Sequence, residues 1–313
     1  MEENREMRQV YCDCLIELAR KNKNIVIFEA DLMKSSGTAR FFKEFPDRAF
    51  DVGVAEANMM TIAAGMSTYG KIPFCTTFAP FATRRAYDQV FISIGYSKRN
   101  VKIVGTDPGI SAELNGGTHM PFEDVGIMRN IPGMVVVEPT DANMLEKIMP
   151  QIAEHEGPVY VRMFRKKTPK IYQDTEEFDL FKAKEIKKGK DCAIICSGIM
   201  VSKAIEAEKA LRQKGYDVGI LNIATIKPID KEAIIECAKY SNAIVTAENH
   251  NIINGLGSAV AEALCENYPT PMIRIGVKDE FGEVGKMDYL EQRYQMSASH
   301  IEEAVEELIK AKK

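Results

Sequence analysis

Short apolar runs alternate with longer stretches of helical period along the first half of the chain. Five runs rich in β-branched residues predict strands over 24–30, 72–78, 101–106, 134–139 and 158–164. The stretches between them predict helices over 55–70, 84–99 and 142–155. Strands of a parallel sheet are buried on both faces, so they appear as nearly continuous apolar runs. The pattern is therefore typical of βα units around a parallel sheet.

The alternation lapses from Arg165 to about Lys190, where the sequence is charged and irregular like a linker. A second series then predicts strands over 191–198, 216–223, 243–249 and 272–277, with helices near 200–214, 230–240 and 256–267. Ser299 is the expected N-cap of a last helix, with acidic residues in its first turn and lysines at its end. We therefore expect an α/β protein of two doubly wound domains with mainly parallel sheets, at 1–165 and 191–313, joined by a linker at 166–190.

The composition indicates which partners and which cellular compartment to expect. Of the 313 residues, 45% are apolar and 27% charged, and the formal charge is −4, so neither nucleic acid nor an anionic membrane is an expected partner. No apolar run is long enough for a membrane span, and the polar start MEENREMRQ does not resemble a signal peptide. The seven scattered cysteines indicate reduced core thiols, which predicts a cytoplasmic protein. Cys12 and Cys14 form a CxC pair, but without a second cluster this is a weak metal signal, and no metal ligand is predicted.

Four polar segments of the first domain stand out as candidate chemistry. They cover 29–36, 51–60, 76–89 and 105–124. Ligands of open α/β sheets bind at the carboxyl ends of the strands, where such segments lie. Each also has a structural explanation: Glu56 suits a helix N-terminus, Phe78 and Phe81 suit a core, and the Gly-rich 105–121 suits a disordered connection. A polar loop of that length inside a compact domain is, however, usually functional.

The order and spacing of these segments resemble the pyrimidine-binding domain of transketolases. The most specific stretch is PDRAFDVGVAEANMMTIAAGMSTYGKIPFCTTFAPFATRRAYDQ, at 46–89, and the resemblance continues through the second domain. It implies a pyrimidine-binding thiamine diphosphate fold followed by a transketolase C-terminal domain. It also implies transfer of a two-carbon ketol unit between sugars.

The resemblance assigns a catalytic role to Glu56, which matches the glutamate that bonds to the cofactor's aminopyrimidine. A carboxyl group can share a proton there only in a dry site, because desolvation disfavours the carboxylate. The small and apolar neighbours of Glu56 fit such a site. Phe81, and less directly Phe78, match the aromatic residues that stack on the pyrimidine. Asp31 and Val54 are further expected cofactor contacts.

The same resemblance places substrate residues along the chain. Arg8, Ser35 and Arg165 match groups that hold the phosphorylated end of the sugar, and a guanidinium can bind such an anion in two places. His119 matches a histidine of some members. Alternatively, these residues are polar surface residues that bind no substrate.

Two positions depart from the family pattern. Asp107 stands where a phosphate-binding histidine is usual, and an acid there repels a dianion. Asn115 replaces an aspartate that contacts a substrate hydroxyl, and it keeps hydrogen bonding but brings no charge. These departures predict a non-standard ketose, for example a branched, deoxy or sulfonated sugar.

The family's diphosphate-binding motif, Gly-Asp-Gly, does not occur in this sequence. The resemblance therefore implies that a separate N-terminal subunit holds the diphosphate and Mg²⁺, and that this chain is inactive without it. The family-like assembly is a heterotetramer with two copies of each chain.

Two other assignments remain open from the sequence. The segment PGMVVVEPTD, at 132–141, also suits the β subunit of a 2-oxoacid dehydrogenase. A non-catalytic regulatory subunit of the same fold is the second, although the presence of Glu56 counts against it. In the second domain, the Gly-rich turn within 248–264 is expected to begin a helix, and a nucleotide site is a weaker alternative because the GxGxxG order is absent.

Overall fold

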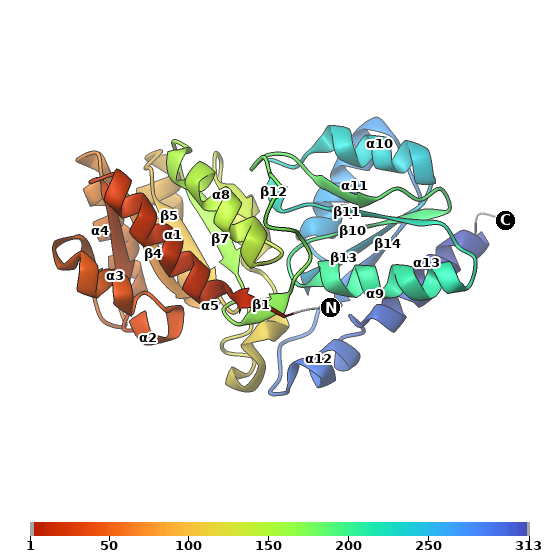
Figure 1. The fold of residues 1–313 in the computed structure, drawn as a ribbon, viewed down its shortest axis with the longest axis horizontal. Coiled ribbons are helices and arrows are strands. Elements are labelled where there is room, and N and C mark those ends of the chain that lie inside the picture. The colour runs from red at the N-terminus through yellow and green to blue at the C-terminus, as the bar shows by residue number, and fades with distance from the viewer. Residues whose placement is uncertain (1–2, 312–313) are drawn as a thin grey trace.

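The computed structural model describes residues 3–311 and contains two α/β units side by side in an elongated molecule (Figure 1). The first sheet has the strand order β12-β6-β7-β5-β4-β2-β3. Its strands are β2 (Ile25–Glu29), β3 (Ala49–Asp51), β4 (Ile72–Phe78), β5 (Lys102–Thr106), β6 (Val135–Val137), β7 (Val159–Met163) and β12 (Thr225–Lys227). All neighbours are parallel except β12 and β6.

Successive residues of a strand point to opposite faces, and both faces of this sheet are covered. Val26 and Phe28 of β2 join one apolar cluster with helix α4 (Glu56–Thr68) and the π-helix η3 (Val90–Tyr96). Ile25 and Ile27 join another with α1 (Met7–Lys21) and α8 (Ala142–Glu154). This two-sided burial explains the continuous apolar runs of the sequence.

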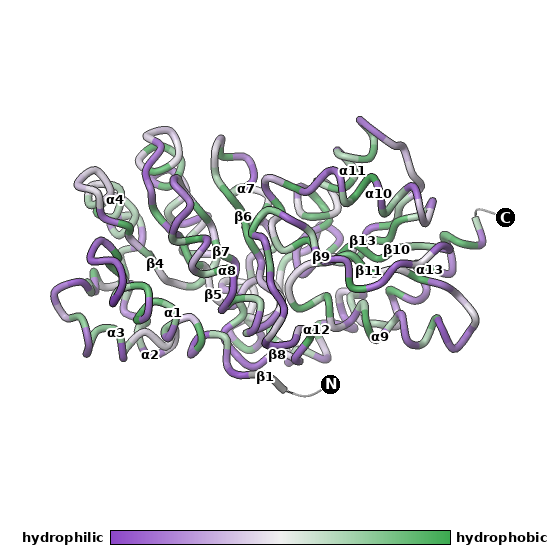
Figure 2. The backbone as a smooth tube through the Cα atoms, turned by 45° about the horizontal axis from the view of Figure 1, so that its top comes forward, coloured by the Kyte–Doolittle hydropathy of each residue, from purple (hydrophilic) through white to green (hydrophobic). Residues whose placement is uncertain are grey.

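The second sheet has the order β14-β13-β10-β11-β9. Its strands are β9 (Lys184–Lys187), β10 (Cys192–Cys196), β11 (Val218–Asn222), β13 (Ile244–Asn251) and β14 (Met272–Val277). Only β9 is antiparallel to its neighbour. The helices are α9 (Met200–Gln213), α10 (Lys231–Ser241), α11 (Leu256–Asn267), α12 (Met287–Arg293) and α13 (Ala298–Ala311). Apolar residues lie mainly on the inner segments of both units, and polar residues along the outer loops (Figure 2).

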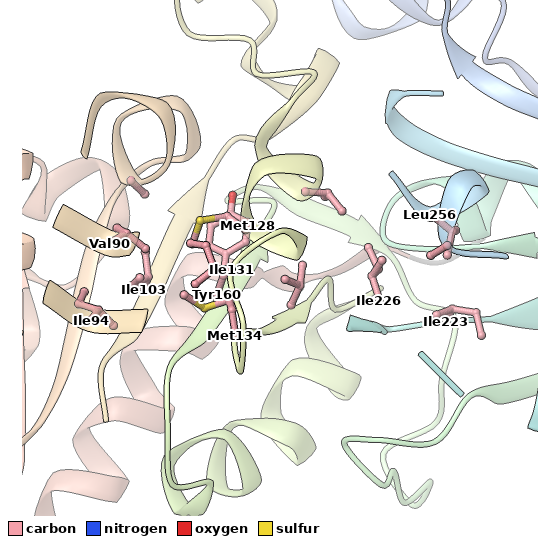
Figure 3. Close-up of a cluster of buried hydrophobic side chains, with 14 of the residues drawn as sticks. Val90, Ile94, Ile103, Met128, Ile131, Met134, Tyr160, Ile223, Ile226 and Leu256 are labelled. Carbon is pink, nitrogen blue, oxygen red and sulfur yellow. The ribbon is translucent and has the colours of Figure 1, made fainter. Parts of the chain in front are cut away.

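The two units share a core. Ile223, Ile226 and Leu256 of the second half belong to the same cluster as Met128 and Tyr160 of the first (Figure 3). The predicted fold class of two mainly parallel α/β units is confirmed. The predicted linker contains β8 (Lys167–Pro169), which pairs with β1 (Glu3–Glu6), and also β9. Strand β12 lies in the predicted second domain by sequence, but it pairs with β6 of the first sheet. The domain boundaries at 165 and 191 remain a prediction.

Three local expectations were wrong or incomplete. The stretch 84–99 is not one α-helix but a succession of η2 (Arg84–Ala86), α6 (Tyr87–Gln89) and the π-helix η3. Helix α13 begins at Ala298, so Ser299 lies inside it and Ser297 precedes it. Helix α1 was not expected. Across residues 3–311, no helix combines the length and apolar character needed to span a membrane.

Candidate active site

The four polar segments follow the carboxyl ends of β2, β3, β4 and β5, which are parallel and so end at one edge of the sheet. After β3 the chain turns into α4, and Asp51 fixes this turn. Its Oδ1 accepts from the backbone N–H of Asp31 and of Gly53, both at 2.9 Å. Gly53 has φ +72°, a conformation that favours glycine. The turn places Glu56 as the first residue of α4.

Glu56 is buried, with 2% of its surface exposed, and it is bound by an arginine that the sequence interpretation missed. Arg85 Nη1 donates to Oε1 and Oε2 of Glu56 at 2.9 and 3.0 Å. The guanidinium carbon of Arg85 also lies 3.7 Å from the centre of the Phe81 ring. A flat cation is thus stacked on an aromatic ring while it bonds a buried carboxylate.

Two more rings surround this pair. Phe78 ends β4, and Phe81 lies in α5 (Ala79–Ala82), with ring centres 6.1 Å apart. The His119 ring lies edge-on, 5.6 Å from Phe78 and 5.0 Å from Phe81. Burial, with the charges of Arg85 and Arg84 beside it, lowers the pKa of His119, so its imidazole is mainly neutral at pH 7.

The Gly-rich loop that carries His119 is held in place by the second unit. Asn249 Oδ1 accepts from the Ile110 N–H, and its Nδ2 donates to the Pro108 carbonyl, both at 2.9 Å. A Cβ added to Gly109, where φ is +57°, would lie 2.2 Å from Asn249 Oδ1. Part of the loop, η4 (Gly109–Asn115), winds into 3₁₀ turns with a kink at Glu113. The alternative of a disordered connection is therefore wrong.

A second group of predicted residues gathers beside Phe78. Arg8 Nη1 and Arg165 Nη1 each donate to the Ser35 carbonyl at 3.4 Å. Arg165 forms an ion pair with Asp107 and lies 5.0 Å from the centre of the Phe78 ring. Burial raises the pKa of Asp107, and the bond to Arg165 opposes this shift.

Three predicted positions stand apart. Asp31, Val54 and Asn115 are exposed, and within residues 3–311 their side chains make no hydrogen bond or ion pair. Their roles remain predictions. The structure adds Arg85, Asn249 and Glu29, which lie in the segments 76–89, 248–264 and 29–36 of the sequence analysis but were given no role there.

The Gly-rich turn of the second unit already has an anion at its helix N-terminus. Glu248 accepts from the N–H groups of Leu256 and Gly257 at 2.6 and 2.9 Å. Burial raises the pKa of Glu248 to about 7. A phosphate would have to displace this carboxylate, which argues against a nucleotide site and favours the helix-start interpretation.

Comparison with protein families agrees with this geometry. Residues 3–170 match the transketolase pyrimidine-binding domain, and residues 181–301 match the transketolase C-terminal domain. The chain belongs to the transketolase family. The resemblance found in the sequence is confirmed, and the family is one of thiamine-dependent transferases.

Relatives of similar length support this placement. The chain is 50% identical over 306 residues to the 6-deoxy-6-sulfo-D-fructose transketolase subunit SqwH of Clostridium sp. strain MSTE9, covering 98% of this chain and 95% of the relative. It is 38% identical to one of the subunits of the apulose-4-phosphate transketolase of Phocaeicola vulgatus, covering 87% of this chain and 88% of the relative.

Solved structures give the same result. A split gene transketolase, described as an inactive β4 tetramer, superposes with a TM-score of 0.90 at 41% identity and covers 99% of this chain and 100% of that one. The transketolase of Leishmania mexicana, at 21% identity, shows the fold alone, and the chain spans 46% of it.

Proposed function

We propose that this chain is the pyrimidine-binding subunit of a split transketolase that transfers a two-carbon ketol unit from a ketose to an aldose. One observation carries the proposal: the buried carboxylate of Glu56 and the ring of Phe81 both contact the flat guanidinium group of Arg85. The guanidinium of Arg85 has the flatness and the N–H donors expected of a protonated aminopyrimidine. Glu56 and Phe81 therefore present the acceptor and the ring face that such a group needs.

When bound, thiamine diphosphate supplies the carbon nucleophile that cleaves the ketose and carries its two-carbon fragment. Glu56 would share a proton with a nitrogen of the pyrimidine ring, and Phe81 would hold the face of that ring. Arg85 would leave this position, since its guanidinium and the pyrimidine cannot both lie on the same face of Phe81. The mainly neutral His119, beside both phenylalanines, is available as a hydrogen-bonding group toward the reacting carbonyl.

The diphosphate and Mg²⁺ belong to a second polypeptide in this proposal. Within residues 3–311, no cluster of three or more histidine, cysteine or acidic side chains could hold a metal. Exposed apolar residues gather around the helix that begins at Glu56 and on the adjoining π-helix: Val54, Ile62, Tyr69, Ile92 and Tyr96. They suit contact with the diphosphate-binding subunit. A heterotetramer, the cytoplasmic location and a non-standard ketose donor are parts of the same proposal.

Reconstitution with the diphosphate-binding subunit tests it. The complex with thiamine diphosphate and Mg²⁺ should release aldehyde from a ketose, and each chain alone should not. Glu56→Gln should lower kcat by about 100-fold or more, because a positioned acid–base group contributes that much. Glu303→Gln, a matched change at an exposed site on α13, should have no effect. Full activity of the Glu56→Gln complex would instead favour a regulatory subunit.

A further inference from the structure

Two guanidinium groups converge on one backbone carbonyl next to the proposed ketose site. Arg8 lies in the first turn of α1, and Arg165 follows β7. Each places Nη1 3.4 Å from the carbonyl oxygen of Ser35, which lies in α2 (Met33–Ser36). Like charges so close repel each other, so anions beside them stabilise this arrangement. Paired guanidinium groups are well suited to a tetrahedral anion.

Each arginine is already compensated once. Arg8 Nε lies 2.9 Å from Glu6 Oε2, with 33% and 26% of the two side chains exposed. Arg165 pairs with Asp107, and there the exposed fractions are 15% and 2%. The four side chains thus have no net formal charge. The inner pair is the better shielded from solvent, so its charges act more strongly on a ligand.

The inner pair also has unused hydrogen-bonding capacity. Within residues 3–311, Asp107 Oδ1 and Arg165 Nε are buried and have no hydrogen-bond partner. Buried polar atoms of native proteins are nearly always paired. A ligand that presents an anionic oxygen to Arg165 and a hydroxyl to Asp107 would satisfy both atoms. A sugar whose last carbon bears an anionic group carries such a hydroxyl on the neighbouring carbon. We call this end of the sugar its tail.

We infer that Asp107 determines the charge preference of this subsite, which selects a ketose ending in a sulfonate over one ending in a phosphate monoester. A sulfonate carries one negative charge, whereas a phosphate monoester carries between about 1.5 and 2 at pH 7. The repulsion from Asp107, which offsets the attraction to Arg165, is therefore nearly twice as large for the phosphate. This inference rests on the proposed ketol transfer, and it adds the class of donor and the residue that selects it.

The test compares two donors that differ only at the tail, 6-deoxy-6-sulfo-D-fructose and D-fructose 6-phosphate. The complex with the diphosphate-binding subunit is assayed with glycolaldehyde, an uncharged acceptor that leaves the tail subsite to the donor. The measured quantity is the quotient of the two kcat/KM values, sulfonate over phosphate. For the native complex we expect it to be about 100 or more.

Two variants separate charge from structure. Asp107→Asn keeps the shape and removes the charge, and it should lower the quotient about tenfold, mainly through a lower KM for the phosphate donor. Asp107→His, which can present a proton to the phosphate, should lower it further. Asp47→Asn removes an exposed carboxylate in the turn before β3 and should leave the quotient within about twofold, as expected for a screened surface charge.

The outcomes are distinguishable. A native complex that uses both donors equally, or an Asp107→Asn complex with an unchanged quotient, overturns the role of Asp107 while ketol transfer stands. A correctly assembled, cofactor-loaded complex that consumes neither these donors nor any other ketose overturns the proposed function itself.

Discussion

At the scale of single residues, the decisive contact is the one between Arg85 and Glu56. Arg84 and Arg85 are neighbours in the 3₁₀ turn η2, yet they face different groups. Arg84 binds Glu123 and the Thr118 carbonyl, whereas Arg85 binds Glu56. Nothing in the sequence distinguishes the two arginines, because the difference arises from how the turn after α5 is oriented. The carboxylate and the aromatic ring could be predicted from their motif, but their arginine partner could not.

Removal of Arg85 tests whether it competes with the cofactor. Arg85→Ala should tighten thiamine diphosphate binding to the complex by up to about tenfold, because the face of the Phe81 ring is then always free. Isothermal titration calorimetry of the Mg²⁺-loaded complex measures this. Arg84→Ala removes a positive charge at the neighbouring position, and it should not tighten binding. Weaker binding in Arg85→Ala would show that Arg85 is a direct ligand instead.

The buried carboxyl group of Glu29 should have a measurable effect on the stability of the protein. Its Oε1 accepts from Ser36 Oγ at 2.7 Å and Thr38 Oγ1 at 2.6 Å, which holds α2 and thereby Ser35 in place. Burial raises the pKa of Glu29 from 4.5 to about 8, and the two hydroxyl groups oppose this shift.

This shift gives stability a definite pH dependence. Between pH 4.5 and 8 the folded protein keeps the Glu29 proton that the unfolded chain releases, so Glu29 makes the free energy of unfolding fall as pH rises. The slope is at most about 1.4 kcal/mol per pH unit. Glu29→Gln lacks this contribution, so urea unfolding at pH 5 and 8 should show the variant gaining stability relative to the native protein as pH rises. A constant difference would contradict the assignment.

At the scale of elements, the long strands and amphipathic helices followed from hydrophobic pattern alone. The sequence of helix α1 has this hydrophobic pattern as well, since the buried residues Met7, Val10, Tyr11 and Leu15 follow a helical period. Strand β12 has three residues, too few for any period, and its partner β6 lies far away in the sequence. Such pairings arise from packing of the whole chain and leave no local pattern.

The loop between β5 and α7 (Asp124–Arg129) depends on one side chain of the second unit. Asn249→Ala would leave the Ile110 N–H buried without a partner, at a cost of about 1–3 kcal/mol, whereas the Pro108 carbonyl keeps its bonds from Ser111. We expect faster hydrogen exchange at residues 109–120 and lower ketol transfer. Asn267→Ala, which removes a bond made by an exposed side chain at the end of α11, is the control. Unchanged exchange in the loop would show that it is held by other contacts.

At the scale of the whole molecule, the two units are joined by a buried ionic cluster as well as by a common core. Arg162, with no exposed side-chain surface, binds Asp124 and Glu138 and donates to the Asn249 carbonyl at 2.7 Å. Glu138 in turn accepts from Ser197 Oγ at the end of β10. Removal of one partner would leave buried charge uncompensated, at about 3–5 kcal/mol. The second unit therefore positions the site although it supplies no predicted site residue.

A structure of this chain bound to the diphosphate-binding subunit and thiamine diphosphate tests the central claim most directly. We predict that a Glu56 carboxyl oxygen lies about 2.6–3.2 Å from a nitrogen of the pyrimidine ring, with Phe81 against the ring face and the Arg85 guanidinium displaced. A complex in which Arg85 still bonds Glu56 over Phe81, while the pyrimidine lies elsewhere, would contradict it.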